Sequence, residues 1–315
     1  SIVIPAYNEE NYAGQTIESF LEMKHPIEII FVDDGSTDDT AQIVKKYPVE
    51  LIRVEHSGPA KAKNIGIKRA NGELIVIHDA NDTILDKNYL MKISQAYLSS
   101  RKRCDLIVVP TRLIPRRDKL LCKAIFVRDY LPYGIEMING IPSTVIMRTA
   151  AFRNDFCKRC IRYDEGLGTC EDMFIRLPEE TKIEVTSKAS TMVMGGAFDS
   201  LSAILSRYIW AGKTLFATWK YGKKRVLTRL IYMSYCASSI IVIPLLLLFT
   251  LYSLLYLLPG ILLESYRSIK VLHYTNSPAI ASLVVFLDYT QGVSYFAGLI
   301  KATILKLLGK YSVAK

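Results

Sequence analysis

Three short stretches of the sequence carry acidic and polar side chains that could bind a charged ligand together. They read Pro-Ala-Tyr-Asn-Glu at 5–9, Asp-Asp-Gly-Ser at 33–36 and Asp-Ala-Asn-Asp at 79–82. Carboxylates that gather at one place repel each other unless a cation or a hydrogen-bond donor joins them. Two partners satisfy this requirement: a divalent cation with oxygen ligands, and the donor groups of a nucleotide.

A divalent cation and a diphosphate suit each other chemically. Magnesium keeps most of its waters and takes one or two carboxylates together with substrate phosphates. A diphosphate leaving group gains charge on its oxygens as its bond to a sugar breaks, and a cation stabilises that charge. Asp34 and Asp79 could instead cap the helices that follow them. Because two such residues stand at two strand ends, we favour a ligand site over two caps.

The segments that must position these residues alternate between strands and helices. Short β-branched runs predict strands at 2–4, 28–32, 51–54, 74–77 and 105–110, and helical stretches fall at 10–23, 37–46 and 60–70. Such alternation is typical of an α/β fold, with a mostly parallel, doubly wound sheet and helices on both faces. Ligands bind beyond the carboxyl ends of the strands in these sheets. We therefore expect the three polar stretches to lie at one edge.

The helix expected at 37–46 has signals at its start. Ser36 precedes it as an N-cap candidate, and Asp38 and Asp39 fall in its first turn. By contrast, the Gly-x-Gly-x-x-Gly turn that dinucleotide-binding enzymes carry after the first strand is absent from the sequence. An NAD or FAD enzyme is therefore disfavoured.

Five ordered blocks of the sequence resemble glycosyltransferase family 2. They are SIVIPAYNEE at 1–10, VDDGSTD at 32–38, AKNIG at 62–66 with ANGE at 70–73, DAND at 79–82, and YDEGLGTCED at 163–172 followed by Arg176-Leu177. The resemblance covers about residues 1–215, and residues 79–82 fall at the place of the family's Asp-x-Asp signature. It implies a GT-A fold, a nucleotide-diphosphate sugar donor (a UDP- or GDP-sugar) and inversion at the anomeric carbon.

The resemblance also implies how the donor is held. The residues that would wall the base and ribose are Pro5, Ala6, Tyr7 and Glu9. Asp34 would accept hydrogen bonds from the base, and Asp79 would lie at the ribose and diphosphate. Position 81 would bind Mg²⁺ or Mn²⁺, so that Asp79 and Asn81 form the implied metal site.

Two residues depart from the family's pattern. Asn81 offers a neutral amide oxygen in place of a carboxylate, which weakens the metal site or shifts it to Asp82. Lys63 stands where the family often has Arg, and Lys binds phosphate as a point charge without the bidentate fork of a guanidinium. Sugar transfer remains the expected activity.

The acceptor side of the site is implied by residues further along the chain. Asp172 would be the general base that removes a proton from the attacking hydroxyl, opposite the leaving diphosphate. Glu171 would lie beside it, although a carboxylate in the first turn of a helix explains Glu171 as well. Arg207 and Trp210 suit phosphate and sugar faces and are expected on the acceptor side. An amphipathic core helix explains this last segment nearly as well.

Positive charge is concentrated in two clusters of this 315-residue chain, whose net charge is +10. Residues 101–128 hold nine Lys or Arg against two Asp, and residues 220–229 add five cations with no acid. Basic clusters beside a hydrophobic span are typical of segments that face anionic lipid headgroups. Because no nucleic-acid-binding motif accompanies the charge, we expect a membrane surface and no nucleic acid as the partner. Within 112–130 the cations interleave with apolar residues, which fits an interfacial segment or a solvated basic loop.

The C-terminal third is far more apolar than the rest. Leu230–Leu263 is an uncharged run of 34 residues, or roughly 50 Å as a helix, while a bilayer core needs about 20 residues. Pro244 or Pro259-Gly260 is the expected break. Residues 277–300 form a second candidate span, interrupted by Asp288, which should face protein or the interface. Basic flanks on both sides predict a helical hairpin with its ends in the cytosol.

The sequence therefore predicts a cytoplasmic GT-A domain at 1–215 and a multi-pass anchor of about two transmembrane helices at 216–315. The expected reaction is inverting sugar transfer to a hydroxyl of a lipid-linked or glycan acceptor at the cell membrane. One alternative is a polyprenyl-phosphate sugar synthase, whose acceptor is already ionised and needs no general base. Another is an inactive nucleotide-sugar-binding scaffold, which the Asn81 departure leaves open.

Overall fold

The structure is a computed structural model, and it describes two parts of the chain in detail. The described residues are 1–101, 103–109, 111–115, 120, 124, 137–138, 141–142, 150–166, 175, 177–186, 190–194, 205–206, 209, 212 and 250–308. The chain divides into two compact units. The first consists mainly of Ser1–Arg116 and Pro132–Gly196, and the second of Arg117–Leu131 and Ala197–Val313.

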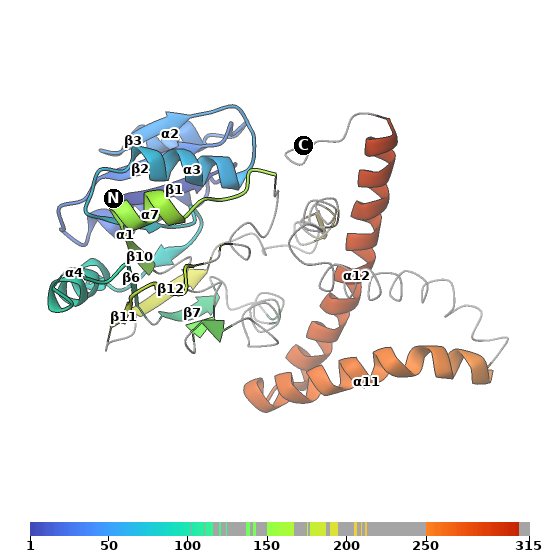
Figure 1. The fold of residues 1–315 in the computed structure, drawn as a ribbon. Helices are drawn as coiled ribbons and strands as arrows, with labels where there is room; N and C mark the ends of the chain where they lie inside the picture. The colour runs from blue at the N-terminus through green and yellow to red at the C-terminus, as the bar shows by residue number, and fades with distance from the viewer. Residues whose placement is uncertain are drawn as a thin grey trace. The chain divides into compact units, whose positions relative to one another are not determined.

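A seven-stranded sheet forms the centre of the first unit (Figure 1). Its strands are β1 (Ile2–Ala6), β2 (Ile29–Asp33), β3 (Glu50–Arg53), β4 (Leu74–Ile77), β6 (Leu106–Val108), β10 (Ala150–Arg153) and β11 (Ile183–Val185). Their order is β11-β6-β10-β4-β1-β2-β3. β10 runs antiparallel to both of its neighbours, and all other pairings are parallel. The predicted mostly parallel α/β sheet is therefore confirmed.

Helices and two small sheets complete the described part of this unit. The helices are α1 (Ala13–Leu21), α2 (Thr40–Val44), α3 (Pro59–Arg69), α4 (Tyr89–Ser99) and α7 (Asn154–Cys160). One small sheet has the order β5-β12-β7, made of Thr83–Ile84, Ser190–Met194 and Thr111–Pro115. The other pairs β8 (Met137–Ile138) with β9 (Ile141–Pro142). The predicted helices are present: α1 and α2 are shorter than the sequence pattern suggested, and α3 has the expected length with a shift of one residue.

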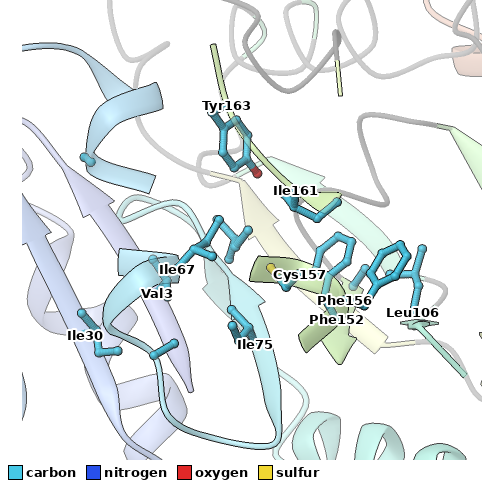
Figure 2. Packing of buried hydrophobic residues seen from close by; sticks show 14 of the residues in the cluster. Val3, Ile30, Ile67, Ile75, Leu106, Phe152, Phe156, Cys157, Ile161 and Tyr163 are labelled. Atoms are coloured by element: carbon cyan, nitrogen blue, oxygen red, sulfur yellow. The ribbon is translucent and has the colours of Figure 1, made fainter. Parts of the chain in front are cut away.

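Close packing of α3 and α7 on the sheet builds one core. The buried cluster joins Val3 and Ile30 from neighbouring strands with Ile67 of α3 and Phe156 of α7 (Figure 2). At Gly66 an added Cβ would lie 2.2 Å from the Val3 Cγ1 atom. Glycine is therefore what allows α3 to approach β1 so closely, and this contact fixes where the start of α3 lies relative to the strand ends.

Two long helices form the described part of the second unit. These are α11 (Thr250–Thr275) and α12 (Pro278–Leu307), drawn in orange and red in Figure 1. Asn276 turns the chain between them with φ of 50°, a conformation that Asn tolerates better than most residues. Ser277 caps α12, since its Oγ atom accepts a hydrogen bond from the Ile280 N–H at 3.3 Å.

The membrane prediction needs correction here. Within the described residues one helix, α12, is long and apolar enough to cross a membrane, so a multi-pass anchor is not supported. The predicted span at 230–263 falls outside the described residues up to 249 and then enters α11. This helix continues through Pro259-Gly260, where a break was expected, and on to Glu264 and Arg267. The predicted domain boundary near residue 215 stays a prediction.

Candidate active site

Three loops lie together at the carboxyl edge of the sheet. β1 is flanked by β2 and β4, and all three strands are parallel, so their following loops share one edge. The side chain of Asn81 donates a hydrogen bond from Nδ2 to the Glu9 Oε1 atom at 2.8 Å. The Asp34 N–H donates to the Ala6 carbonyl at 2.8 Å. The structure thus brings the three polar stretches together, while their roles in ligand binding stay predictions.

The loop after β1 is fixed by the loop after β2. Asn8 has a positive φ of 57°, and its N–H donates to the Ser36 Oγ atom at 2.9 Å. In return, the Asn8 Oδ1 atom accepts a hydrogen bond from the Thr37 N–H at 2.8 Å. Ser36 is therefore not a helix cap, as the sequence suggested; α2 begins at Thr40. The hydroxyl of Ser36 serves the neighbouring loop instead.

Asp34 is a buried carboxylate that organises the connection between β3 and α3. Its Oδ1 atom accepts from the Ser57 N–H at 2.9 Å and its Oδ2 atom from the Gly58 N–H at 2.8 Å. The His56 Nδ1 atom lies 2.9 Å from Oδ2. Gly35 follows with φ of 74°, and a Cβ there would come within 2.8 Å of the His56 backbone nitrogen. Asp34 thus positions the loop residues beside it.

A stacked aromatic pair lies at this corner of the edge. The rings of Tyr7 and His56 are stacked, with centroids 4.0 Å apart and planes at 23°. Tyr7 is exposed, whereas Pro5 and Ala6 are buried within β1. A flat aromatic face suits a nucleobase, because every type of base has a flat face that can stack on it. The role of Tyr7 at the base stays a prediction, and His56, which the sequence did not single out, supports its ring.

Lys63 carries a buried positive charge next to Asp79. Its Nζ atom lies 4.0 Å from the Asp79 Oδ1 atom and 5.0 Å from the centre of the Tyr163 ring. The Lys63 side chain is buried, while that of Asp79 is 25% exposed. A lysine in this position offers a compact positive charge that could bind an anionic group near Asp79.

The Glu9 carboxyl is in a strongly negative environment. Burial, which disfavours the charged form, is the main reason why its pKa rises to about 7. The hydrogen bond from Asn81 lowers the pKa, and the nearby carboxylates of Asp79, Asp82 and Asp38 raise it further. The local excess of negative charge is what a bound cation would relieve.

The oxygen-bearing side chains here fit a divalent cation only in part. Among the described residues, no group of three or more His, Cys, Asp or Glu side chains could hold a metal ion. Asp79 offers one accessible carboxylate and Asn81 an amide, whereas Asp82 is fully buried. Mg²⁺ and Mn²⁺ accept such a small protein set when phosphate oxygens complete it. A cation is therefore compatible with this edge only together with a diphosphate.

A second contact links α3 to the start of the block at 163–172. Asn64 accepts a hydrogen bond from the Tyr163 N–H at 3.0 Å and donates to the Tyr163 carbonyl at 2.9 Å. It also donates to the Glu165 Oε1 atom at 3.0 Å. Nothing in the sequence marks this pairing, because the partners are 99 and 101 positions apart. Asn64 thus holds Tyr163–Glu165 beside the Lys63 end of the site.

The predicted acceptor residues cannot be placed in this geometry. Asp172, Glu171, Arg207 and Trp210 all lie outside the described residues. The described part of the Glu-Asp block is Tyr163–Gly166. The base and acceptor roles therefore stay predictions.

Comparison with known proteins identifies the N-terminal part of the chain. Residues 1–156 match the family model described as Glycosyl transferase family 2. Poly(ribitol-phosphate) β-N-acetylglucosaminyltransferase TarS of Staphylococcus aureus strain Mu50 is 36% identical over 93 residues, which is 27% of this chain and 16% of TarS. Minor teichoic acid biosynthesis protein GgaA of Bacillus subtilis strain 168 is 34% identical over 122 residues, 35% of this chain and 27% of GgaA. The chain thus spans less than a third of each relative.

Matches to solved structures cover more of the chain. S. aureus TarS 1–349 in complex with UDP-GlcNAc shares 18% identity, covering 98% of this chain and 92% of that one, with a TM-score of 0.47. Mannosyltransferase PcManGT from Pyrobaculum calidifontis, in complex with GDP-Man and Mn²⁺, also shares 18% identity. It covers 98% and 87% of the two chains, with a TM-score of 0.48.

Proposed function

We propose a sugar-transfer reaction for this chain, whose residues 1–156 match the model of glycosyl transferase family 2. The donor is a nucleotide-diphosphate sugar, of the UDP or GDP type, and the acceptor is a hydroxyl group. Transfer inverts the configuration at the anomeric carbon. The observation that carries the proposal is the hydrogen bond between Glu9 and Asn81, which joins the loops after β1 and β4 where the family's donor residues are expected.

Each described site residue has a task that its surroundings support. The stacked Tyr7 and His56 rings offer a face for the base. Asp34 keeps the loop beside them in place by accepting hydrogen bonds from the Ser57 and Gly58 N–H groups. The Asp34 carboxylate would also accept a hydrogen bond from the base. Lys63 supplies positive charge at Asp79, next to which the diphosphate would lie. The donor is thus oriented by residues that are already held by the protein before it binds.

Asp79 and Asn81 would hold a Mg²⁺ or Mn²⁺ ion together with the donor phosphates. When bound, this cation neutralises charge that develops on the leaving diphosphate. Glu9 hydrogen-bonds to Asn81 and therefore fixes the orientation of its amide. We propose that Asp172 takes the proton from the acceptor hydroxyl on the opposite side of the sugar.

The acceptor is proposed to be a membrane-associated glycan or polyol-phosphate polymer. TarS is named for transfer to poly(ribitol-phosphate) and GgaA for teichoic acid biosynthesis, which supports a hydroxyl-bearing polymer for this chain. The apolar helix α12 supports a location at a membrane. A phosphate acceptor, as in a polyprenyl-phosphate sugar synthase, would make Asp172 dispensable.

Release of nucleoside diphosphate from a panel of UDP- and GDP-sugars, with Mn²⁺ and with chelator, tests the donor half of the proposal. We expect release from at least one donor, and a loss of activity in Asp79→Asn. Asp39→Asn is the matched control, because Asp39 is exposed and lies on the neighbouring loop. Binding of nucleotide without turnover of any donor would point to an inactive scaffold.

Asp172→Asn tests the acceptor half. An amide cannot take up a proton, so we expect the maximal transfer rate to fall by at least about a hundredfold while donor affinity is kept. Equal rates for the variant and the wild type would favour a phosphate acceptor. Loss of donor binding would place Asp172 on the donor side or in a structural role.

A further inference from the structure

The outward side of α11 is apolar, although the helix carries several charged side chains. Five large residues on it are exposed: Leu258, Leu262, Tyr266, Ile269 and Leu272. They are spaced by three or four positions, so they lie on one face of the helix, here named the outer stripe of α11. A helix on a water-soluble protein turns such residues towards the core.

Two charged side chains of α11, Glu264 and Arg267, lie on its other side, towards α12, while the Lys270 Nζ atom lies 4.5 Å from the centre of the Tyr266 ring. The Arg267 Nη1 atom is 3.1 Å from the Asp288 Oδ2 atom of α12 and 3.4 Å from the Glu264 Oε1 atom. Asp288 is 6% exposed. Val271, one turn after Arg267, is fully buried on the same side. Charges directed inwards with large apolar residues directed outwards are typical of helices surrounded by lipid, where ionisable groups pair within the protein.

α12 has the same arrangement. Phe286, Ile300, Ile304 and Leu307 are exposed at positions that lie on one helix face, here named the outer stripe of α12. The residues of its other face are buried and include Val284, Leu287, Asp288 and Ala302. Both helices therefore carry an apolar face that their packing on each other leaves uncovered.

The charge of the C-terminal segment indicates what covers these surfaces. After Asp288 the sequence contains Lys301, Lys306, Lys310 and Lys315 and no acid. Lys301 and Lys306 are exposed in the last turns of α12, and Lys301 follows Ile300 of the outer stripe directly. Such lysines lay their alkyl chains along apolar surface and reach anionic headgroups with their ammonium groups. A second copy of the chain would bring like charges together instead.

We propose that α11 and α12 both dock on an anionic lipid bilayer through their outer stripes, with the Arg267–Asp288 ion pair facing inwards between the helices. This inference rests on the proposed membrane location. It goes beyond that location because it assigns a lipid-facing surface to α11, a helix that also carries charged side chains. It is independent of the sugar-transfer reaction.

Co-sedimentation of the full chain with vesicles tests the proposal without any donor. The vesicles contain phosphatidylcholine alone or a mixture with phosphatidylglycerol, and the bound fraction is measured after dilution from detergent. We expect Leu262→Gln/Ile269→Gln to weaken binding about tenfold or more, since each side chain contributes apolar area. Leu98→Gln on α4 is the matched control, because Leu98 is 62% exposed and Leu262 is 60% exposed. Lys301→Gln/Lys306→Gln should lower binding only to the anionic vesicles.

Unchanged vesicle binding by Leu262→Gln/Ile269→Gln overturns the proposal. A change in oligomeric state by light scattering, with vesicle binding kept, overturns it in favour of a second copy as the occupant. Circular dichroism and thermal melting of each variant verify that the helices are intact, and Tyr266→Gln provides a milder substitution in the same stripe. Sugar transfer to a soluble acceptor should be the same in wild type and variants, so failure here is distinct from failure of the proposed reaction.

Discussion

Asp34 lies beside the His56 ring and the N–H groups of Ser57 and Gly58, which belong to one loop. Both of its carboxylate oxygens accept hydrogen bonds from these backbone N–H groups. A carboxylate in this place therefore does structural work before any nucleotide arrives. Its position at the end of β2 could be predicted from the sequence, but its partners Ser57 and Gly58 could not, because they are 23 and 24 positions away.

Asp34→Asn tests this structural role. An amide NH₂ group would face the N–H of Ser57 or Gly58, and two donors cannot satisfy each other. We expect the free energy of unfolding to fall by about 1–3 kcal/mol, and nucleoside diphosphate affinity to fall with it. Urea denaturation and calorimetric titration measure the two effects. Asp39→Asn should change neither; an unaltered stability of Asp34→Asn would mean that the loop is held by other contacts.

Glu9 gives the protein a defined response to pH. Its pKa rises from an ordinary value of 4.5 to about 7 in the folded protein. Between these two pH values the Glu9 carboxyl is protonated in the folded state and ionised in the unfolded chain. This contribution to stability is fully present below pH 4.5 and is lost as the pH rises through 7. The amide side chain of the Glu9→Gln variant cannot ionise, so this variant should not lose stability in the same way as the pH rises. Its free energy of unfolding relative to wild type should therefore increase by about 1–3 kcal/mol from pH 4.5 to 8.

Urea denaturation in the presence of chelator at several pH values measures this difference. Glu22→Gln, at an exposed position on the C-terminal side of α1, is the control and should follow the wild-type curve. If Glu9→Gln and wild type show parallel stability curves across this range, Glu9 titrates normally in the folded protein.

At the scale of elements, α3 connects the proposed donor side of the site to the segment that precedes Asp172. Asn64 makes this connection through three hydrogen bonds to Tyr163 and Glu165. The position of α3 is in turn fixed by the contact between Gly66 and Val3. A shift of α3 would therefore displace both sides of the site at once.

Asn64→Ala should separate these two sides. We expect the donor dissociation constant to change little and the maximal transfer rate to fall roughly 10–100-fold, because small displacements of a catalytic group have effects of this size. Hydrogen exchange at the Tyr163 amide should become faster, which a purely chemical role of Asn64 would not cause. Asn71→Ala is the control, because Asn71 is exposed and lies just after the C-terminal end of α3. Equal losses in donor affinity and rate would assign Asn64 to the donor side.

The order of elements could be predicted from the sequence, because strand and helix patterns in α/β proteins are local. β1, β2, β3 and β4 appear within one or two residues of their expected positions. The direction of β10 could not be predicted, since Ala150–Arg153 has no feature that distinguishes an antiparallel strand from a parallel one. The Tyr7–His56 stack likewise depends on the Asp34 loop, which only the folded chain brings near β1.

At the scale of the whole molecule, the two units differ in where their large apolar residues lie. The first unit encloses its apolar residues in a core around the sheet, whereas α11 and α12 expose theirs. A chain ending near residue 215 should therefore stay monomeric in plain buffer and bind nucleoside diphosphate, while the full chain should need detergent or lipid. Size-exclusion chromatography with light scattering measures both. A full chain that is monomeric without detergent would remove the membrane from the proposal.

The antiparallel direction of β10 has a consequence for how such proteins diversify. β6 ends at the carboxyl edge of the sheet, and β10, which runs the other way, begins at that same edge. The connection of 41 residues between Val108 and Ala150, which includes the basic stretch at 112–128, thus starts and finishes at the edge of the sheet where β1, β2 and β4 end. Its length and content can change without altering the order of β1, β2 and β4, since loop extension costs little. Insertions in this connection can therefore lengthen the chain at this edge while the strands that precede Glu9, Asp34 and Asp79 keep their order.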